Sequence, residues 1–318
     1  MTLGAILVIK LGALGDVAQA FGAFQAIRRH HAGAKIVLLT TPPFAKLLAP
    51  SPWFDEVWID ERPPAWRLAW LGLRARIRAA RFARIYDLQT TSRSDWYFRM
   101  LGPGARPEWV GTAPGASHRH VDPRRDLLHN YDRLGAQLAL AGIASIPPPD
   151  LSWLDADLSR FGLPAHFGLL VPGTSAHRAI KRWPTPNFAA IAALLDARGI
   201  TPVVVGGGDE RDLAAAIRAV CPAARDLTGT TSIPELAALG RKAAIAIGND
   251  TGPMHLIAET RTPTLMLMSR ESNPAHCAPR GPAARWLRRD FIKDLPVADV
   301  EAAIAELLAN DGKKEGSG

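Results

Sequence analysis

The chain has 318 residues, of which 47% are hydrophobic, and its net charge is +8. This length is typical of two domains rather than one, and two cysteines exclude a disulfide-rich scaffold. No apolar run reaches the roughly 18 residues that a membrane span requires, which excludes an integral membrane helix. The apolar N-terminus lacks a basic lead and a cleavage site, so we expect a first strand, not a signal peptide, in a cytoplasmic protein.

The first half of the chain is predicted to alternate strands with helices. Apolar runs predict strands at 3–10, 35–40, 55–60, 83–89 and 106–111, and helical periodicity predicts helices at 16–30, 65–81 and 126–143. Three consecutive prolines then interrupt both kinds of pattern within IPPPDLSWL, residues 146–154. That stretch is the predicted linker.

The alternation restarts in the second half. Strands are predicted at 167–172, 201–208, 243–250 and 262–268, and helices at 185–198, 209–219, 252–260 and 297–309. Such alternation favours parallel, doubly wound sheets, so we predict two Rossmann-like α/β domains, residues 1–150 and 151–310. The polar tail 311–318 is predicted to be disordered. Ligands in such sheets bind beyond the carboxyl ends of the strands.

The positive charge is concentrated in the first domain. Residues 1–150 contain 19 lysines and arginines against 12 acidic residues, whereas the rest of the chain is nearly balanced. The predicted helix 65–81 places Trp66, Trp70, Leu73 and Ile77 at helical spacing beside several arginines. Two interpretations remain open: the helix lies on an anionic membrane surface, or its apolar side packs on the core while the arginines are solvated.

The loop after the first strand, KLGALGD at 10–16, ends with Asp16 at a helix start. Its glycines let the backbone approach a ligand closely, but the pattern is not a dinucleotide fingerprint. Asp16 has two interpretations. It stabilises the helix through its macrodipole, or it is a general base.

Three loops of the second domain contain candidate ligand groups. Thr174, Ser175 and Lys181 offer hydroxyls and a cation in a long loop, a set that suits a diphosphate. Glu210, after a triple glycine, can accept ribose hydroxyls. Asp250 and His255 lie in NDTGPMH, where Pro253 is suited to the first turn of a helix. In each loop, helix capping alone is the alternative. Asp155 and Asp157 match a short metal-binding pattern that is common by chance, and we expect no metal site.

Taken together, these segments resemble the ADP-heptose:lipopolysaccharide heptosyltransferase family, glycosyltransferase family 9. The matching segments are ILVIK with GALGD, YDLQ, PGTSAHRAIKRWP, VVVGGGDE and IGNDTGPMHLIAE. The combination of KRWP with NDTGPMH about 70 residues later is the most specific part. The resemblance implies a GT-B fold, in which two Rossmann-like domains face each other across a cleft, and no metal or other cofactor besides the nucleotide-sugar substrate.

The resemblance also implies a reaction and roles. The reaction is an inverting transfer of a heptose-type sugar from an ADP donor to a lipopolysaccharide core or related glycolipid. Asp16 would deprotonate the acceptor hydroxyl, and Lys181 would stabilise the leaving ADP. Glu210 would contact the ribose. The remaining donor contacts would be Thr174, Ser175, Asp250, Thr251, Gly252 and His255.

The acceptor side departs from the family pattern. Relatives carry a histidine three residues after the motif aspartate, where this chain has Gln19, and a Gly and a Lys after YDLQ, where it has Thr90–Ser94. The expected acceptor is an anionic glycolipid, with peripheral contact to the inner-membrane surface as an open possibility. The alternative function is a catalytically inactive nucleotide-sugar-binding protein of the same fold. Nucleic-acid binding is disfavoured because no aromatic platform accompanies the basic residues.

Overall fold

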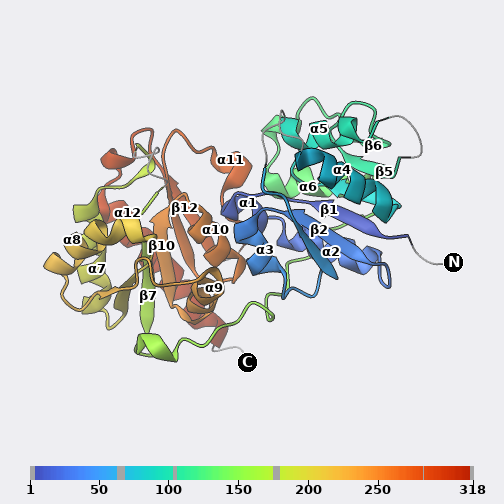
Figure 1. Cartoon of the computed structure of the whole chain (residues 1–318). Helices are drawn as coiled ribbons and strands as arrows, with labels where there is room; N and C mark the ends of the chain where they lie inside the picture. The colour runs from blue at the N-terminus through green and yellow to red at the C-terminus, as the bar shows by residue number, and fades with distance from the viewer. Residues whose placement is uncertain (1–3, 63–68, 103–105, 175–179, 282, 316–318) are drawn as a thin grey trace. The chain divides into compact units, whose positions relative to one another are not determined.

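The computed structural model describes residues 4–62, 69–102, 106–174, 180–281 and 283–315. The chain forms two compact units, Met1–Trp153 and Leu154–Gly318, which are described separately below (Figure 1). The division falls at the end of the predicted proline-rich linker.

The first unit is built on a six-stranded parallel sheet with the order β3-β2-β1-β4-β5-β6. Its strands are β1 (Ile6–Ile9), β2 (Ile36–Thr40), β3 (Glu56–Ile59), β4 (Arg84–Asp87), β5 (Glu108–Gly111) and β6 (His118–Arg119). This is the doubly wound order, and its direction reverses between β1 and β4. Loops after those two strands therefore lie where such sheets bind ligands.

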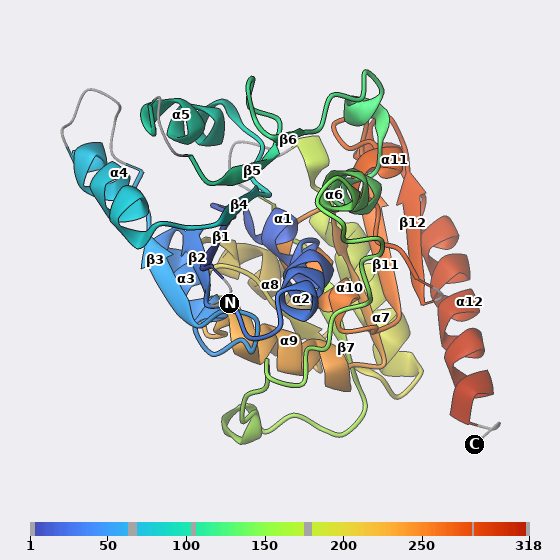
Figure 2. The same cartoon turned by 90° about the vertical axis from the view of Figure 1, so that its right-hand side faces the viewer.

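Helices cover both faces of this sheet (Figure 2). They are α1 (Leu14–Ala18), α2 (Phe21–His30), α3 (Pro42–Leu48), α4 (Ala69–Ala80), α5 (Ser92–Met100) and α6 (Asn130–Ala139), with a 3-10 turn at Arg125–Leu127. The single helix predicted at 16–30 is two helices, and the one predicted at 126–143 is the 3-10 turn followed by α6. Extended backbone at Leu128 separates those two elements.

The second unit repeats the same topology, with the strand order β12-β11-β10-β7-β8-β9. Its parallel strands are β7 (Phe167–Val171), β8 (Thr201–Val204), β9 (Arg225–Asp226), β10 (Ile245–Asn249), β11 (Thr264–Met268) and β12 (Ala284–Arg288). The order reverses between β7 and β10. The predicted α/β class with two Rossmann-like doubly wound domains is therefore confirmed.

The helices of the second unit are α7 (Thr185–Ala197), α8 (Arg211–Val220), α9 (Ile233–Lys242), α10 (Gly252–Glu259), α11 (Pro274–Cys277) and α12 (Val297–Glu315), with short 3-10 turns at Ser159–Phe161, Gly208–Glu210 and Ile292–Asp294. Helices α7, α8 and α12 pack with the sheet around one core, and α9 packs with α10. Helix α12 extends five residues into the segment 311–318 that the sequence predicts to be disordered.

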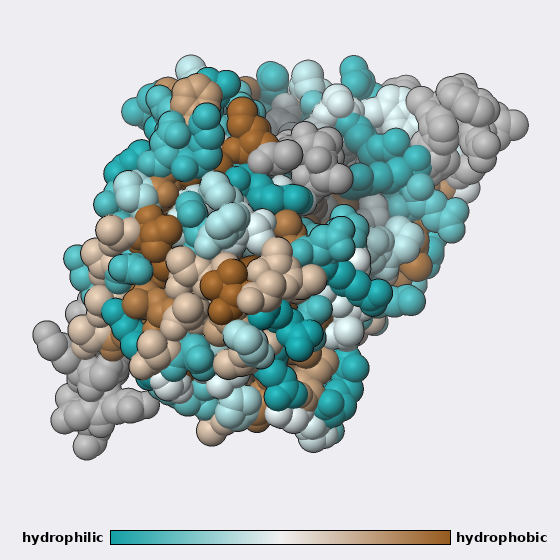
Figure 3. Space-filling model, turned by 90° about the vertical axis from the view of Figure 1, so that its left-hand side faces the viewer, coloured by the Kyte–Doolittle hydropathy of each residue, from teal (hydrophilic) through white to brown (hydrophobic). Residues whose placement is uncertain are grey.

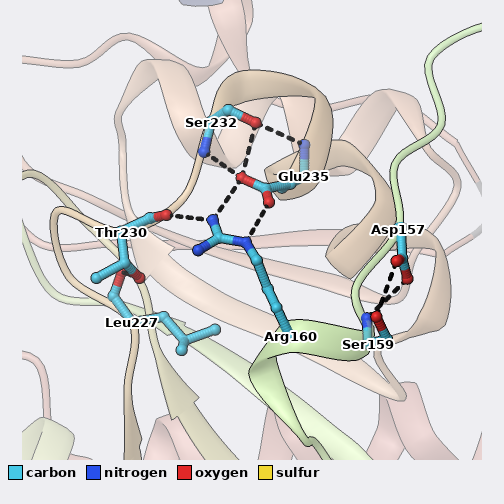
Figure 4. A network of polar contacts seen from close by, with 7 residues as sticks. All are labelled: Asp157, Ser159, Arg160, Leu227, Thr230, Ser232 and Glu235. Atoms are coloured by element: carbon cyan, nitrogen blue, oxygen red, sulfur yellow. Dashed lines mark hydrogen bonds and ion pairs between the residues drawn. The ribbon is translucent and has the colours of Figure 1, made fainter.

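The segment that opens the second unit is fixed to the N-terminus of α9 (Figure 4). Arg160 forms a two-pronged ion pair with Glu235, at 2.8 and 3.0 Å, and donates a third hydrogen bond to the Thr230 carbonyl. Hydrogen bonds, first from Arg160 and then from Ser232, lower the pKa of Glu235 to about 2, although burial opposes them. Asp157 accepts from Ser159 while Asp155 pairs with Arg241, so the two carboxylates of the DxD pattern have separate partners.

The basic helix packs on the core of its own unit. Ile77 of α4 is buried among the residues of the first core, and Trp70 and Leu73 pack against that core. Trp66 lies outside the described residues.

Among the residues that the structure describes, no helix is long and apolar enough to cross a membrane. On the face drawn in Figure 3, hydrophobic residues lie in small groups between hydrophilic ones, as is ordinary for a protein surface.

Candidate active site

The candidate donor residues lie beyond the carboxyl ends of neighbouring strands in the second unit. Lys181 belongs to the loop after β7, Asp250 follows β10 directly, and His255 is in the first turns of α10. Because β7 and β10 are paired at the reversal point of the sheet, their loops meet there. A fourth residue, Ser272, comes from the loop after β11.

These four side chains form one buried group, the Asp250 cluster. The Lys181 ammonium lies 2.8 Å from Oδ2 of Asp250, and His255 Nε2 lies 3.1 Å from Oδ1. The Ser272 hydroxyl also donates to Oδ2. The side chains of Lys181, Asp250 and His255 are each exposed by less than a tenth. The structure thus joins three of the residues predicted from sequence and adds Ser272.

The carboxylate of Asp250 is strongly stabilised in its ionised form. Burial alone would raise its pKa, but hydrogen bonds from His255, Lys181 and Ser272 hold that pKa well below the usual value of 3.8. Asp250 therefore carries a permanent negative charge whose acceptor positions are shared among three donors. The geometry gives Asp250 the role of orienting Lys181 and His255, which the sugar contact implied by the resemblance did not include.

Asn249 fixes the loop that carries Lys181. Its fully buried side chain accepts a hydrogen bond from the Trp183 backbone N–H at 2.9 Å and donates to the Pro172 carbonyl at 2.8 Å. The buried Trp183 indole in turn donates to the Leu295 carbonyl. Sequence reasoning gave Asn249 no role. A polar residue at the end of an otherwise apolar strand is the signal that would have found it, because buried amides must be hydrogen bonded.

The Glu210 carboxylate is hydrogen bonded to the backbone of two neighbouring loops. It accepts from the Gly207 N–H at 2.9 Å and from the Thr174 N–H. A Cβ placed on Gly173 would lie 1.6 Å from Oε1 of Glu210, so this glycine makes room for the carboxylate. Burial raises the pKa of Glu210 despite these hydrogen bonds. The structure thus gives Glu210 a loop-joining role that the expected ribose contact did not include.

The remaining predicted donor residues surround the start of α10 and the loop after β7. Thr251 precedes α10 in extended conformation, and its buried hydroxyl has no hydrogen-bond partner within the described chain. Gly252 is the first residue of α10, where backbone N–H groups favour an anion. Thr174 is buried and its backbone contacts Glu210. Ser175 lies outside the described residues.

In the first unit, Asp16 is an exposed residue of α1. Its Oδ2 accepts from the Ala13 N–H at 3.2 Å, as a helix-capping carboxylate does. The loop that carries it is tied to the loop after β4, because Gln89 accepts from the Leu11 N–H at 2.8 Å. Capping explains the position of Asp16 and leaves its exposed carboxylate accessible to a ligand.

Two buried charged residues flank that loop. Lys10, at the end of β1, donates to the Leu88 carbonyl at 3.1 Å, and burial lowers its pKa. Asp87 ends β4 with both oxygens buried, and Oδ2 has no hydrogen-bond partner among the described residues. Burial raises the pKa of Asp87 to about 6, although hydrogen bonds from the Thr90 backbone, the Ser94 side chain and the Gln89 backbone oppose the shift.

Residues 70–294 match a protein-family model described as glycosyltransferase family 9 (heptosyltransferase). The chain belongs to glycosyltransferase family 9. The match covers α4 from its second residue, the rest of the first unit beyond it and the whole Asp250 cluster.

Individual family 9 relatives are distant. Lipopolysaccharide heptosyltransferase 3 of Escherichia coli is 30% identical over 183 residues, which are 52% of this chain and 53% of the relative. The chain therefore matches about half the length of that protein. The lipopolysaccharide core heptosyltransferase OpsX of Haemophilus influenzae is 23% identical over 291 residues, 86% of this chain and 80% of the relative.

Solved family 9 structures share the fold over nearly the whole chain. A glycosyltransferase family 9 protein from Veillonella parvula has a TM-score of 0.81 at 20% identity and covers 98% of this chain and 99% of its own. The E. coli heptosyltransferase WaaC, solved with ADP, has a TM-score of 0.76 at 19% identity and covers 95% of this chain and 99% of its own. The GT-B class implied by the sequence is the class of these neighbours.

Ser272→Ala tests whether the hydrogen bonds of the Asp250 cluster stabilise the protein. It removes one donor to a buried carboxylate and should lower the free energy of unfolding by about 1.5–3 kcal/mol at neutral pH. Because the pKa of Asp250 is depressed in the folded state, this stabilisation is fully present above pH 3.8, the usual value, and is lost only as the pH falls through the much lower pKa of the folded state. Urea unfolding from pH 7 to the most acidic pH at which the wild type still folds should show a constant difference between variant and wild type above pH 3.8 and a narrowing difference only in the most acidic part of the range. Ser272→Thr, which keeps the hydroxyl, is the control, and a pH-independent difference would mean that Ser272 acts by packing alone.

Proposed function

We propose that this chain transfers a heptose-type sugar from an ADP-linked donor to a sugar of a lipopolysaccharide core or related glycolipid. The observation that carries the proposal is the Asp250 cluster, in which a buried lysine is held at the strand ends where doubly wound sheets bind nucleotides. Family membership supports it, as do the names of the relatives. The WaaC neighbour was solved with ADP and with ADP-2-deoxy-2-fluoro heptose.

The proposed donor site lies in the second unit. The Lys181 ammonium has one hydrogen directed to Asp250, and its other two can bind diphosphate oxygens. The Thr251 hydroxyl, buried without a partner in the described chain, and the N-terminal N–H groups of α10 add uncharged donors. Together these groups stabilise the negative charge that develops on ADP as it leaves.

The proposed reaction is a single displacement. Asp16 takes the proton of the acceptor hydroxyl, the acceptor oxygen forms a bond to the anomeric carbon, and the bond from that carbon to the diphosphate oxygen breaks with its electron pair going to ADP. Attack opposite the leaving group inverts the anomeric centre. No step of this proposed displacement uses a metal. We propose that the enzyme works in the cytoplasm, as the sequence predicts.

A thermal-shift panel of nucleotides, followed by mass spectrometry of transfer products, tests this function. ADP and ADP-heptose at about 100 times Kd should stabilise the protein by about 2.7 kcal/mol, whereas UDP and GDP should not. Transfer to a deacylated core oligosaccharide should follow with ADP-heptose. A preference for UDP or GDP would contradict the donor assignment. Tight ADP-heptose binding without transfer to any acceptor would favour the inactive nucleotide-sugar-binding alternative.

A further inference from the structure

The first unit contains a cavity of about 310 Å³ that the donor site does not use. It lies between α4, α5 and the end of β3. Two half-buried tryptophans form part of its wall, Trp70 from α4 and Trp96 from α5, with ring centroids 5.0 Å apart at 73°. We call this cavity the Trp70–Trp96 pocket. Its volume is at the lower end of the range for small-ligand sites.

The lining of the Trp70–Trp96 pocket combines aromatic rings with planar charged groups. Asp60, Glu61, Arg76 and Arg93 contribute the charges. A pyranose has apolar C–H faces that pack on aromatic rings, and hydroxyls and acidic substituents that guanidinium and carboxylate groups bind. This mixture suits a sugar ring better than an acyl chain, which would remove Glu61 and Arg93 from water without offering them a hydrogen-bond partner.

The floor of the pocket is held in place by hydrogen bonds. The buried Tyr97 hydroxyl donates to Oδ2 of Asp60, which is itself 3% exposed. Arg93 donates to the Tyr97 oxygen at 3.3 Å. Arg76 is already engaged, because it pairs with Glu56 at 3.0 Å and stacks on Trp58. Arg93 is therefore the cation we assign to an anionic ligand.

The pocket is connected to the loop that carries Asp16. Oδ1 of Asp60 accepts from the Arg62 N–H at 2.8 Å, and the Arg62 guanidinium donates to the Leu11 carbonyl at 2.6 Å. Leu11 lies in the loop between β1 and Asp16. All these residues belong to the first unit and lie at the carboxyl edge of its sheet. A sugar in the pocket would thus be bound beside the loop of the candidate base.

We propose that the Trp70–Trp96 pocket binds an anionic sugar of the acceptor, with the ring against the tryptophans and its phosphate or carboxylate on Arg93. This inference rests on the proposed function for the identity of the acceptor. A membrane-surface role for the same tryptophans is less well supported, because both are half-buried and pack against each other and the core.

Arg93→Gln and Trp96→Leu test the pocket against Arg99→Gln, which removes an exposed arginine of the same helix that does not line the cavity. Binding of a deacylated, phosphorylated core oligosaccharide is measured by calorimetry, and kinetics with varied acceptor and varied donor follow. Each pocket variant should weaken oligosaccharide binding and raise the acceptor KM by about 10- to 100-fold, with ADP affinity and donor KM unchanged. Arg99→Gln should match the wild type. An oligosaccharide that has neither phosphates nor acidic sugars should bind the wild type and Arg93→Gln equally.

The outcomes separate the two proposals. Unchanged oligosaccharide affinity in both pocket variants, with retained ADP binding, would overturn the pocket and leave the proposed function intact. Binding of phosphatidylglycerol vesicles that Trp96→Leu abolishes, without an effect on the oligosaccharide, would also overturn it, in favour of a membrane surface. If the wild type bound no ADP-linked sugar, the proposed function would fail, while calorimetry with the oligosaccharide would still test the pocket.

Discussion

Lys181→Met should lower the rate of sugar transfer by about 10²- to 10³-fold, the loss expected when one preorganised group that stabilises transition-state charge is removed. The effect should fall mainly on kcat, because negative charge on the leaving diphosphate increases as the glycosidic bond breaks. The Lys181 side chain is only 8% exposed, so solvent screens its charge weakly. Initial rates of transfer at saturating donor measure kcat, and calorimetry with ADP measures nucleotide affinity. The two measurements separate a loss of catalysis from a loss of binding.

Two further variants control for charge and for folding. Lys181→Arg keeps the charge but replaces a compact ammonium with a planar fork, so we expect partial activity. Lys242→Met removes an exposed lysine at the end of α9 and should behave as the wild type. Because Lys181→Met leaves Asp250 with two donors, unfolding must be followed in parallel. A variant that is folded, binds ADP and transfers within twofold of the wild-type rate would contradict the leaving-group role.

The central strands could be predicted from sequence because they are buried on both faces. β1, β2, β7, β10 and β11 are fully buried apolar runs, which is the pattern of parallel sheets with two covered faces. Of the four edge strands, β3 was predicted at 55–60, and the other three were missed for the opposite reason. β12 reads ARWLR and is largely exposed, and β6 and β9 have two residues each, so none shows an apolar run.

Several helices had signals that were overlooked. Two prolines open α3, and proline is favoured in the first turn of a helix. Ser232 and Glu235 form a capping box at the start of α9, a spacing visible in the sequence. Helix α5 has no comparable apolar periodicity, and its position follows from the βαβ topology instead.

The candidate site residues that belong to a sequence motif could be predicted, whereas the residues that reach the site only through tertiary contacts could not. Lys181, Asp250 and His255 lie in the two most specific motifs and do come together. Ser272 lies 22 residues from Asp250, and only the pairing of β10 with β11 brings their loops together. The residue type of Glu210 likewise does not reveal that its carboxylate accepts from the Gly207 N–H and lies against Gly173.

Asp16→Asn separates the two interpretations of Asp16 that the sequence left open. An asparagine keeps a side-chain oxygen that can accept from the Ala13 N–H, so the start of α1 remains capped, and losing the negative charge there costs about 0.3–1 kcal/mol. The amide cannot take a proton from the acceptor hydroxyl. The variant should therefore fold and bind ADP as the wild type does, while kcat falls by about 10²- to 10⁴-fold.

Asp16→Ala supplies the comparison, because it removes both the base and the cap. It should be as inactive as Asp16→Asn and additionally less stable, by about 1 kcal/mol for the lost hydrogen bond from the Ala13 N–H. If Asp16→Asn transferred sugar at the wild-type rate, the carboxylate would be a capping group alone. The proton acceptor would then have to be sought among the other acids at this edge of the first sheet. Asp87 is the first candidate there, since burial raises its pKa to about 6 and one of its oxygens has no hydrogen-bond partner among the described residues.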